Sequence, residues 1–269
     1  MALRLPASTA LAPRVAAKIA AFLASEAGAA ARDEIARGAL GRAVGVNRHT
    51  WEDWITGPNG PRMLPKTREA AVSGLDLLHQ GAESGRGTHR ITRADLAEAS
   101  SQGAGAHGRT RLFVASMIWG SGTTNGRGPR YLAKALTDHN LDHVLDETFG
   151  LVAGGELADA YRRFVLAGVG RSFFTKWFWA CSLAGQPERV PLILDDRVIA
   201  TANQLDWYFR PTGKNWPDRY DAYVDMARDI ATHISGDGLI ATSEHVEWLL
   251  FARGTNSLIR WIEATRGPA

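Results

Sequence analysis

Two residues have side chains that could do covalent chemistry, Lys176 and Asp195. Lys176 lies in an aromatic run, RSFFTKWFWA, and Asp195 follows the apolar run VPLIL. Burial among aromatic rings lowers the pKa of an ammonium group, and the neutral amine is a nucleophile. A carboxylate can stabilise developing positive charge or take up a proton from such an amine. The alternatives are a lysine whose stem covers apolar surface and an aspartate that caps the next helix.

A glycine hairpin precedes the lysine and is the element that would position it. LAGVGRS, at 166–172, separates two segments with helical spacing, and its two glycines allow a tight turn between them. Such a turn directs backbone N–H groups and a helix N-terminus outward, where a phosphate oxygen can bind. The alternative is a helical hairpin that only packs.

Helical spacing extends over most of the remaining chain, and it predicts an all-α protein. Thr92 is a predicted helix N-cap, 47–67 is predicted as loop because it is dense in Pro and Gly, and 100–110 is predicted as a flexible joint. We expect two domains, an N-terminal helical region at 1–108 and a denser module at 109–269. The predicted helices are 13–40, 66–80, 91–101, 111–118, 129–139, 141–149, 155–166, 171–184, 196–208, 217–235, 243–253 and 256–265.

Composition excludes several classes of protein and site. The 269 residues include one cysteine, Cys181, so neither a disulfide framework nor a four-cysteine metal site can form within the chain. We therefore expect a reducing, cytoplasmic setting. No apolar run is long enough to span a bilayer, and the net charge of +3 permits contact with a polyanion without requiring it. The histidines show no metal-ligand spacing, so no metal is expected.

The order of these features resembles the helix-hairpin-helix DNA glycosylases, especially the 8-oxoguanine branch. LAGVGRS, an intervening helix and VPLILDDRV match the hairpin and the proline-to-aspartate segment of that superfamily, over about residues 109–254. The resemblance implies a helix-hairpin-helix DNA glycosylase fold with helical layers flanking a central cleft. It also implies double-stranded DNA with a modified base as the partner.

The resemblance implies roles for the hairpin and for the two reactive residues. Asp195 occupies the position of the catalytic aspartate, and Lys176 would attack the sugar C1′ as the amine nucleophile of a bifunctional enzyme. The usual lysine position holds Ser172, and Lys176 lies one helical turn later on the same face. Alternatively, Ser172 marks a monofunctional enzyme and Lys176 is incidental. The residues expected to clamp a phosphate are Gly168, Val169, Gly170, Arg171 and Ser172.

A second DNA contact is implied for the segment IWGSGTTNGRGPR at 118–130. In the family the corresponding connection enters the minor groove and fills the gap left by the extruded base. Thr124, Asn125 and Arg127 are the residues that match this role. The alternative is a flexible surface loop.

The late segment SEHVEWLLFARG resembles the base-recognition helix of 8-oxoguanine glycosylases. Glu247 and Phe251 match a Gln and Phe pair that reads and stacks on the flipped base. A carboxylate only accepts hydrogen bonds, so Glu247 favours a base or adduct rich in donors. Trp119 is a further candidate for the wall of the base pocket. The alternative is an apolar helix face that carries an exposed glutamate.

The sequence thus predicts a DNA glycosylase with abasic-site lyase activity. Its substrate would be 8-oxoguanine, in base excision repair, or a bulky phage base such as glucosylated hydroxymethylcytosine, in antiviral defence. The alternative is a non-catalytic helix-hairpin-helix module that only binds DNA. We expect a monomer associated with a bacterial nucleoid, without cofactor except for a cation held by the hairpin carbonyls.

Overall fold

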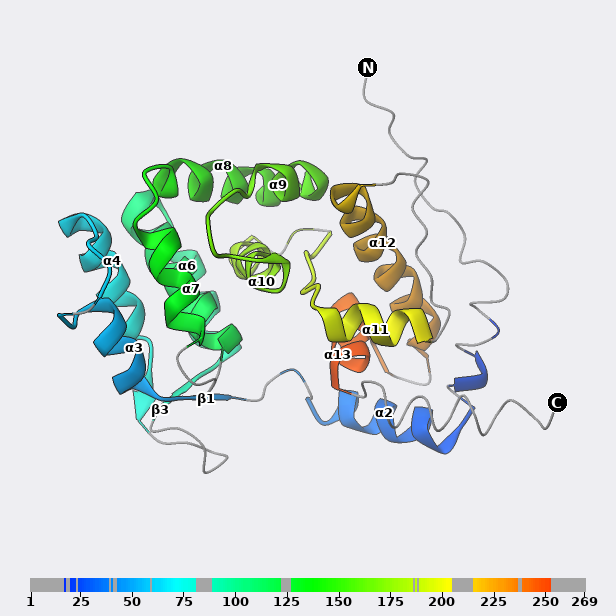
Figure 1. Cartoon of the computed structure of the whole chain (residues 1–269). Helices are drawn as coiled ribbons and strands as arrows, with labels where there is room; N and C mark the ends of the chain where they lie inside the picture. The colour runs from blue at the N-terminus through cyan, green and yellow to red at the C-terminus, as the bar shows by residue number, and fades with distance from the viewer. Residues whose placement is uncertain are drawn as a thin grey trace, which may run out of the picture. The chain divides into compact units, whose positions relative to one another are not determined.

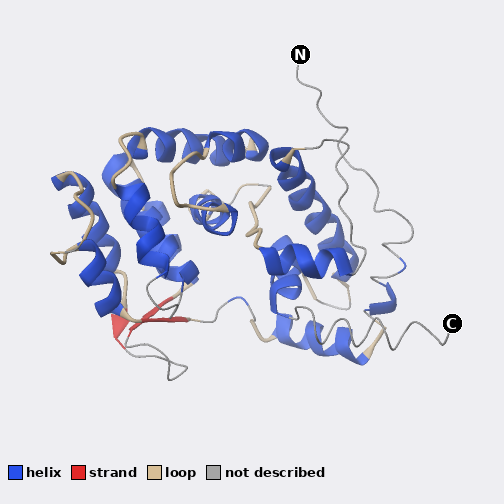
Figure 2. Ribbon diagram, in the orientation of Figure 1, coloured by secondary structure: helices blue, strands red, loops and turns tan. Residues whose placement is uncertain are grey.

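The protein folds into two compact units, each described here by itself. The computed structural model describes residues 17, 20–22, 24–38, 40, 43–58, 60–80, 89–121, 127–185, 187, 189–204, 215–236 and 239–252. Unit 1 combines Met1–Leu40 with Leu194–Ala269, and unit 2 is Gly41–Ile193. Helices make up most of both units (Figure 2), which confirms the prediction of an all-α fold.

Unit 2 is built around α6, the longest of its described helices. Val114, Ala115 and Ile118 of α6 are fully buried, and the helix packs against α4, α5, α7, α8 and α10. In Figure 1, α10 is seen nearly end-on, with α6 and α7 on one side of it and α8 and α9 on another. The helices of unit 2 are α3 (Arg48–Ile55), α4 (Pro65–Leu75), α5 (Arg93–Ser101), α6 (Gly105–Ser121), α7 (Arg127–Leu136), α8 (Leu141–Ala153), α9 (Leu157–Arg163) and α10 (Arg171–Ser182).

An aromatic cluster fixes one face of α10 in the core. The Trp177 indole N–H donates to the Thr148 hydroxyl at 3.0 Å, and the Trp177 ring meets Phe113 edge-on at 5.7 Å. Phe174 stacks on Phe164 at 5.2 Å between ring centroids. Buried aromatic pairs of this kind each add about 1 kcal/mol beyond the area they bury. The position of α10 is therefore set by residues from α6, α8 and the end of α9.

A small antiparallel sheet, which the sequence did not predict, joins the start of unit 2 to α5. Its strands are β1 (Val44–Val46), β2 (His79–Gln80) and β3 (His89–Ile91), in the order β1-β3-β2, with Val44 opposite Ile91. Strands of two or three residues are too short to show an alternating apolar pattern. The sheet does not change the all-α class.

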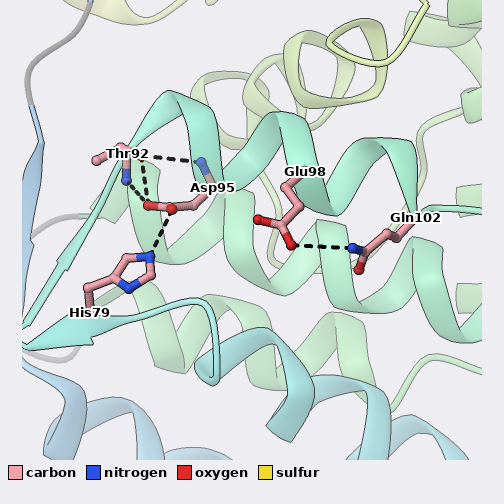
Figure 3. A network of polar contacts seen from close by, with 5 residues as sticks. All are labelled: His79, Thr92, Asp95, Glu98 and Gln102. Atoms are coloured by element: carbon pink, nitrogen blue, oxygen red, sulfur yellow. Dashed lines mark hydrogen bonds and ion pairs between the residues drawn. The ribbon is translucent and has the colours of Figure 1, made fainter.

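A capping box at the start of α5 holds β2 in place (Figure 3). The Asp95 N–H donates to the Thr92 hydroxyl oxygen at 3.2 Å, and the Thr92 N–H and hydroxyl each donate to Asp95 Oδ2 at 2.7 Å. This confirms Thr92 as the predicted N-cap. His79 Nε2 of β2 lies 2.8 Å from Asp95 Oδ1. One turn further along α5, the Gln102 amide donates to Glu98 at 3.3 Å.

Unit 1 contains α2 (Glu26–Ala36), α11 (Asp196–Gln204), α12 (Trp216–Ile234) and α13 (Ser243–Ala252). α13 packs against both α11 and α12. Tyr220 and Tyr223 of α12 are fully buried. The Arg32 guanidinium of α2 donates to the Gly236 carbonyl at 3.1 Å, which ties α2 to the turn after α12.

The segment predicted as loop at 47–67 contains α3, so that prediction was wrong. Trp51 and Ile55 are spaced by four residues and are both buried, so they form the apolar face of one short helix. The Pro and Gly residues that suggested a loop follow the helix at 57–61.

The predicted joint at 100–110 was also wrong, because α6 begins at Gly105. A Cβ built at Gly108 would lie 2.5 Å from the Gln102 carbonyl oxygen, so this glycine serves close packing rather than flexibility. The expected domain boundary after residue 108 falls inside α6, and the division into 1–108 and 109–269 stays a prediction.

The first predicted helix, 13–40, is interrupted at Ser25. The Ser25 hydroxyl accepts from the Gly28 N–H at 3.1 Å and caps α2. Among the described residues, no helix is long and apolar enough to cross a membrane.

Candidate active site

The hairpin joins α9 to α10, and its two glycines serve different purposes. Gly168 has a φ of 82°, and a Cβ built there would lie 2.9 Å from the Tyr131 carbonyl oxygen of α7. Both the left-handed backbone and the close approach therefore require glycine at this position. Gly170 has an ordinary φ of −75°, and a Cβ there would meet nothing within 4 Å. The tight turn depends on Gly168, while Gly170 leaves open space.

That open space lies at the N-terminus of α10. Gly170 is the N-cap residue and offers no side chain to the first N–H groups of the helix. Its carbonyl accepts from the N–H groups of Phe173 and Phe174 at 2.9 and 3.1 Å. The positive end of the helix dipole, towards which the first N–H groups point, favours an anion at such an end. The phosphate clamp assigned to this end of α10 stays a prediction.

The other predicted clamp residues differ in how deeply they are buried. Val169 is 8% exposed, so its side chain anchors the hairpin in unit 2. Arg171 and Ser172 are half-buried. Burial raises the pKa of the Tyr161 hydroxyl, and the Arg171 guanidinium that contacts it acts in the opposite direction. Arg171 is thereby held against the side of α9.

Lys176 is half-buried on the face of α10 that also carries Ser172. Its ammonium donates to the Ser172 carbonyl at 2.8 Å and lies 5.1 Å from the centre of the Phe173 ring. Phe174 and Trp177, two of the aromatic residues that the sequence placed around the lysine, pack in the core of unit 2. The amine is thus held against its own helix, on the side shared with Ser172, as the spacing predicts.

Gly120 provides the space for the lysine, and the sequence did not reveal this role. A Cβ built at Gly120 would overlap the Lys176 Cδ and lie 2.8 Å from its Cε, so the aliphatic stem runs over the glycine. Gly120 belongs to the last turn of α6, where alanine would favour the helix by up to about 1 kcal/mol. Gly120 lies within the segment 118–130 that the resemblance assigns to the minor groove. The signal in the sequence was a glycine at a position with helical spacing, where no turn requires one.

Trp119, a predicted wall of the base pocket, belongs to a stack in unit 2. Its ring stacks on Trp179 at 4.9 Å with an interplanar angle of 22°. The Arg93 guanidinium carbon lies 4.6 Å from the Trp179 ring centre and 5.6 Å from that of Trp119. The Trp119 indole N–H is buried and has no hydrogen-bond acceptor within the described part of the chain. Trp119, which precedes Gly120 in α6, therefore packs against Trp179.

The predicted minor-groove wedge is described only at its edges. Thr124 and Asn125 lie outside the described residues, and so does the side chain of Arg127, whose backbone begins α7. A Cβ built at Gly128 would overlap the Ser121 hydroxyl oxygen, so the residues that flank the wedge are in contact. The assignment of the three wedge residues stays a prediction.

Asp195 lies in unit 1 and is half-buried at the start of α11. Its Oδ1 accepts from the Val198 N–H at 2.8 Å, so Asp195 is the N-cap that the sequence allowed it to be. The preceding Leu194 is fully buried. The backbone and one carboxylate oxygen of Asp195 are therefore fixed in position.

The two predicted base-reading residues of α13 differ in exposure. Glu247 is 5% exposed, and Phe251 is 40% exposed with the Arg197 guanidinium 4.7 Å from its ring centre. The pKa of Tyr223 is raised well above its ordinary value, first by burial and then by the carboxylates of Glu247 and Asp195, with Tyr220 adding to the effect. Within unit 1, Asp195 and Glu247 therefore both act on the same buried hydroxyl.

The described residues contain no group of three or more His, Cys, Asp or Glu side chains that could hold a metal ion. Cys181 is buried, and burial raises the pKa of its thiol well above the ordinary value. A buried neutral thiol is a poor nucleophile. The expectation of no cofactor, apart from a cation at the hairpin, stays a prediction.

A protein-family comparison identifies the family to which the chain belongs. A family model described as "Putative 8-oxoguanine DNA glycosylase OGG-like protein" matches residues 37–251. The chain belongs to this OGG-like family. The match confirms the resemblance and extends it from 109 back to 37, so the OGG-like region includes all of unit 2. No curated protein and no solved structure matches the chain.

Membership of the OGG-like family indicates, at the level of protein class, a DNA glycosylase that binds DNA. The matched range contains Lys176, Asp195, Glu247, Phe251 and the hairpin.

Proposed function

We propose that this OGG-like chain excises an oxidised purine from duplex DNA with Lys176 as the amine nucleophile. The observation that carries the proposal is the position of the lysine on α10. Its ammonium is held by the Ser172 carbonyl and its stem runs over Gly120, one turn beyond the N-terminus that the hairpin leaves open. An open helix N-terminus and an amine thus share one end of one helix.

This N-terminus would bind a phosphate beside the target nucleotide. N–H groups in the first turn of α10 and the open space at Gly170 let a phosphate oxygen approach the backbone closely. This contact carries no sequence information, and it sets the register of the nucleotide relative to α10. The target base would leave the stack, because its glycosidic bond cannot be reached inside the duplex.

The Lys176 ammonium would first give up one proton to water, and the neutral amine would then attack C1′ of the extruded nucleotide. In this step the Lys176 Nζ–C1′ bond forms while the C1′–N bond to the base breaks, and the base leaves with the bonding electron pair. The resulting C1′–NH2⁺ group loses one proton, and the nitrogen lone pair then breaks the C1′–O4′ bond, with O4′ taking up a proton, to give the protonated Schiff base. The Ser172 carbonyl accepts a hydrogen bond from one N–H of the amine and so orients the nitrogen lone pair.

We assign the catalytic carboxylate to Asp195. Its N-cap hydrogen bond to Val198 fixes the carboxylate orientation, so an ionised carboxylate would be presented without reorganisation. Its role is to stabilise positive charge on C1′ as the base departs.

An oxidised guanine is the preferred substrate. The Watson–Crick edge of a guanine presents N–H donors, and the Glu247 carboxylate can only accept. Phe251 offers an exposed ring for stacking, next to Arg197. The description of the family names 8-oxoguanine.

The experiment is mass spectrometry of bases released from three duplexes, combined with borohydride trapping of the Schiff base. The duplexes carry 8-oxoguanine, no modification, or glucosylated hydroxymethylcytosine. We expect release of 8-oxoguanine and a trapped covalent complex for the wild type. Lys176→Gln should give no trapped complex, and Asp195→Asn should slow base release by about 100-fold or more. Lys66→Gln, which removes a lysine paired with Asp142 on the surface of unit 2, is the matched control.

Each other outcome would change the proposal. Base release without a trapped complex would make the enzyme monofunctional, with Lys176 incidental and Ser172 marking that class. Release of the glucosylated base alone would replace the substrate. DNA binding without release of any base would support the non-catalytic module instead.

A further inference from the structure

The exposed face of α7 is a cationic surface in unit 2. Arg130, Tyr131 and Lys134 are exposed, with Tyr131 at 43%, while Leu132 and Ala135 on the opposite side are buried. Arg130 and Lys134 are four residues apart, so their side chains lie on the same face of the helix. α7 therefore presents two cations and one aromatic hydroxyl to solvent.

This face is continuous with the hairpin. A Cβ built at Gly168 would lie 2.9 Å from the Tyr131 carbonyl oxygen and 3.2 Å from the Lys134 Cδ, so the lysine stem lies against the glycine. The Tyr131 ring lies 6.2 Å from the ring of Phe173 in the first turn of α10. A molecule that contacts the hairpin would meet the α7 face next.

The two α7 cations differ from the arginines at the end of α9. Arg162 pairs with Asp159 at 2.6 Å and Arg163 with Glu147 at 3.3 Å. Arg130 and Lys134 form no ion pair within the described ranges. Within the described ranges no carboxylate neutralises their charge, which favours contact with a polyanion.

We propose that Arg130, Tyr131 and Lys134 bind the phosphodiester backbone of duplex DNA beside the hairpin, whether or not the DNA is damaged. The inference rests on the proposed function as a DNA-acting enzyme, and it adds a contact used during the search for damage. Two ammonium or guanidinium groups would neutralise phosphates, and the Tyr131 hydroxyl would donate to a phosphate oxygen. The exposed tyrosine ring also offers an apolar surface to a sugar.

The test is the affinity of the full chain for an undamaged duplex, measured by fluorescence anisotropy at several salt concentrations. Each phosphate that is neutralised contributes about 0.9 to the slope of log K against log salt. We expect Lys134→Gln and Arg130→Gln each to reduce the slope by about that amount, and the double variant by about twice as much. Lys66→Gln removes the same charge from a lysine paired with Asp142 and should leave the slope unchanged.

The results separate this surface from the catalytic proposal. If the wild type binds DNA and excises a base, an unchanged slope in the double variant overturns the α7 surface alone. If the slope falls as expected and no duplex loses a base, the surface stands and the proposed function fails. If the wild type binds no duplex, both are overturned. The substituted residues are exposed, and thermal unfolding of each variant is the check that it remains folded.

Discussion

The pairing of Gly120 with Lys176 is the most specific arrangement at the scale of single residues. The lysine stem occupies the volume that a side chain at 120 would fill. A lysine is a flexible side chain, so an added methyl group would displace it rather than shift the backbone of α6. A substitution at Gly120 can therefore shift the Lys176 amine while the lysine itself is kept. Such a variant tests the position of the amine separately from its presence.

Gly120→Ala is expected to reduce Schiff-base trapping by about 100-fold, because displacement of a reacting atom by about 1 Å costs that much. Stability should change by less than about 1 kcal/mol, since alanine favours the helix and offsets the rearrangement of the lysine. Borohydride trapping, DNA affinity and thermal unfolding are the measurements. Gly150→Ala on α8 is the control, because a Cβ there meets nothing within 4 Å. Undiminished trapping by Gly120→Ala would argue against Lys176 as the nucleophile.

At the scale of elements, the two glycines of the hairpin are expected to have different roles. Gly168 is needed for folding, and Gly170 leaves space for binding. Gly168 has a positive φ and touches α7, whereas Gly170 has an ordinary φ and borders open space. The same substitution should therefore act on stability at one position and on DNA at the other.

Gly168→Ala should destabilise unit 2 by about 1–3 kcal/mol, because of the left-handed backbone and the approach to the Tyr131 carbonyl. Gly170→Ala should cost less than about 1 kcal/mol, the loss expected when alanine replaces a glycine N-cap, and should weaken DNA binding through the added Cβ. Urea unfolding and anisotropy titration measure the two effects. Equal destabilisation by both variants would show that Gly170 also serves packing.

The capping box of α5 gives the fold an acid-sensitive element. Burial acts to raise the pKa of Asp95, but the hydrogen bonds from Thr92 and His79 outweigh it and hold the pKa below its ordinary value of 3.8. A depressed pKa stabilises the fold fully above the unfolded-state value, and that stability is lost as the pH falls through the folded-state pKa.

Asp95→Asn should lower the free energy of unfolding at pH 7, and its deficit relative to the wild type should shrink as the pH falls below about 4. Urea unfolding at pH 7, 5, 4 and 3 measures this difference. Gln102→Ala at the other end of α5 is the control. This variant keeps Asp95, so its loss of unfolding free energy should not shrink as Asp95 becomes protonated. A deficit for Asp95→Asn that is the same at every pH would contradict the proposed hydrogen-bonding origin.

At the scale of the whole molecule, the chain builds part of unit 1, then unit 2, and returns to unit 1 at Leu194. The family match spans both, from 37 to 251. α6 packs against α4 and α5, and a Cβ built at Gly74 of α4 would lie 2.9 Å from a Val114 methyl group. α4 and α5, which precede residue 109, therefore help to form the core around the helix that contacts Lys176.

The isolated segment 109–269, the denser module expected from the sequence, should not fold cooperatively. It lacks α4 and α5 and would expose the α6 residues that they cover, including Val114, which is fully buried in the whole chain. Circular dichroism during urea unfolding distinguishes a cooperative transition from a gradual one. A cooperative transition with wild-type helicity would support the division at 108.

The sequence by itself determined the features that depend on local spacing. Helical periodicity gave the fold class, the glycines at 168 and 170 located the turn before α10, and the cap at Thr92 followed from one side chain and its neighbours. These features need only residues within about one or two turns of each other. Tertiary structure alone decided the short sheet, the packing of α3, and the place of Gly120 under Lys176. Each of these depends on atoms that lie far apart in the sequence and meet only after the helices have packed.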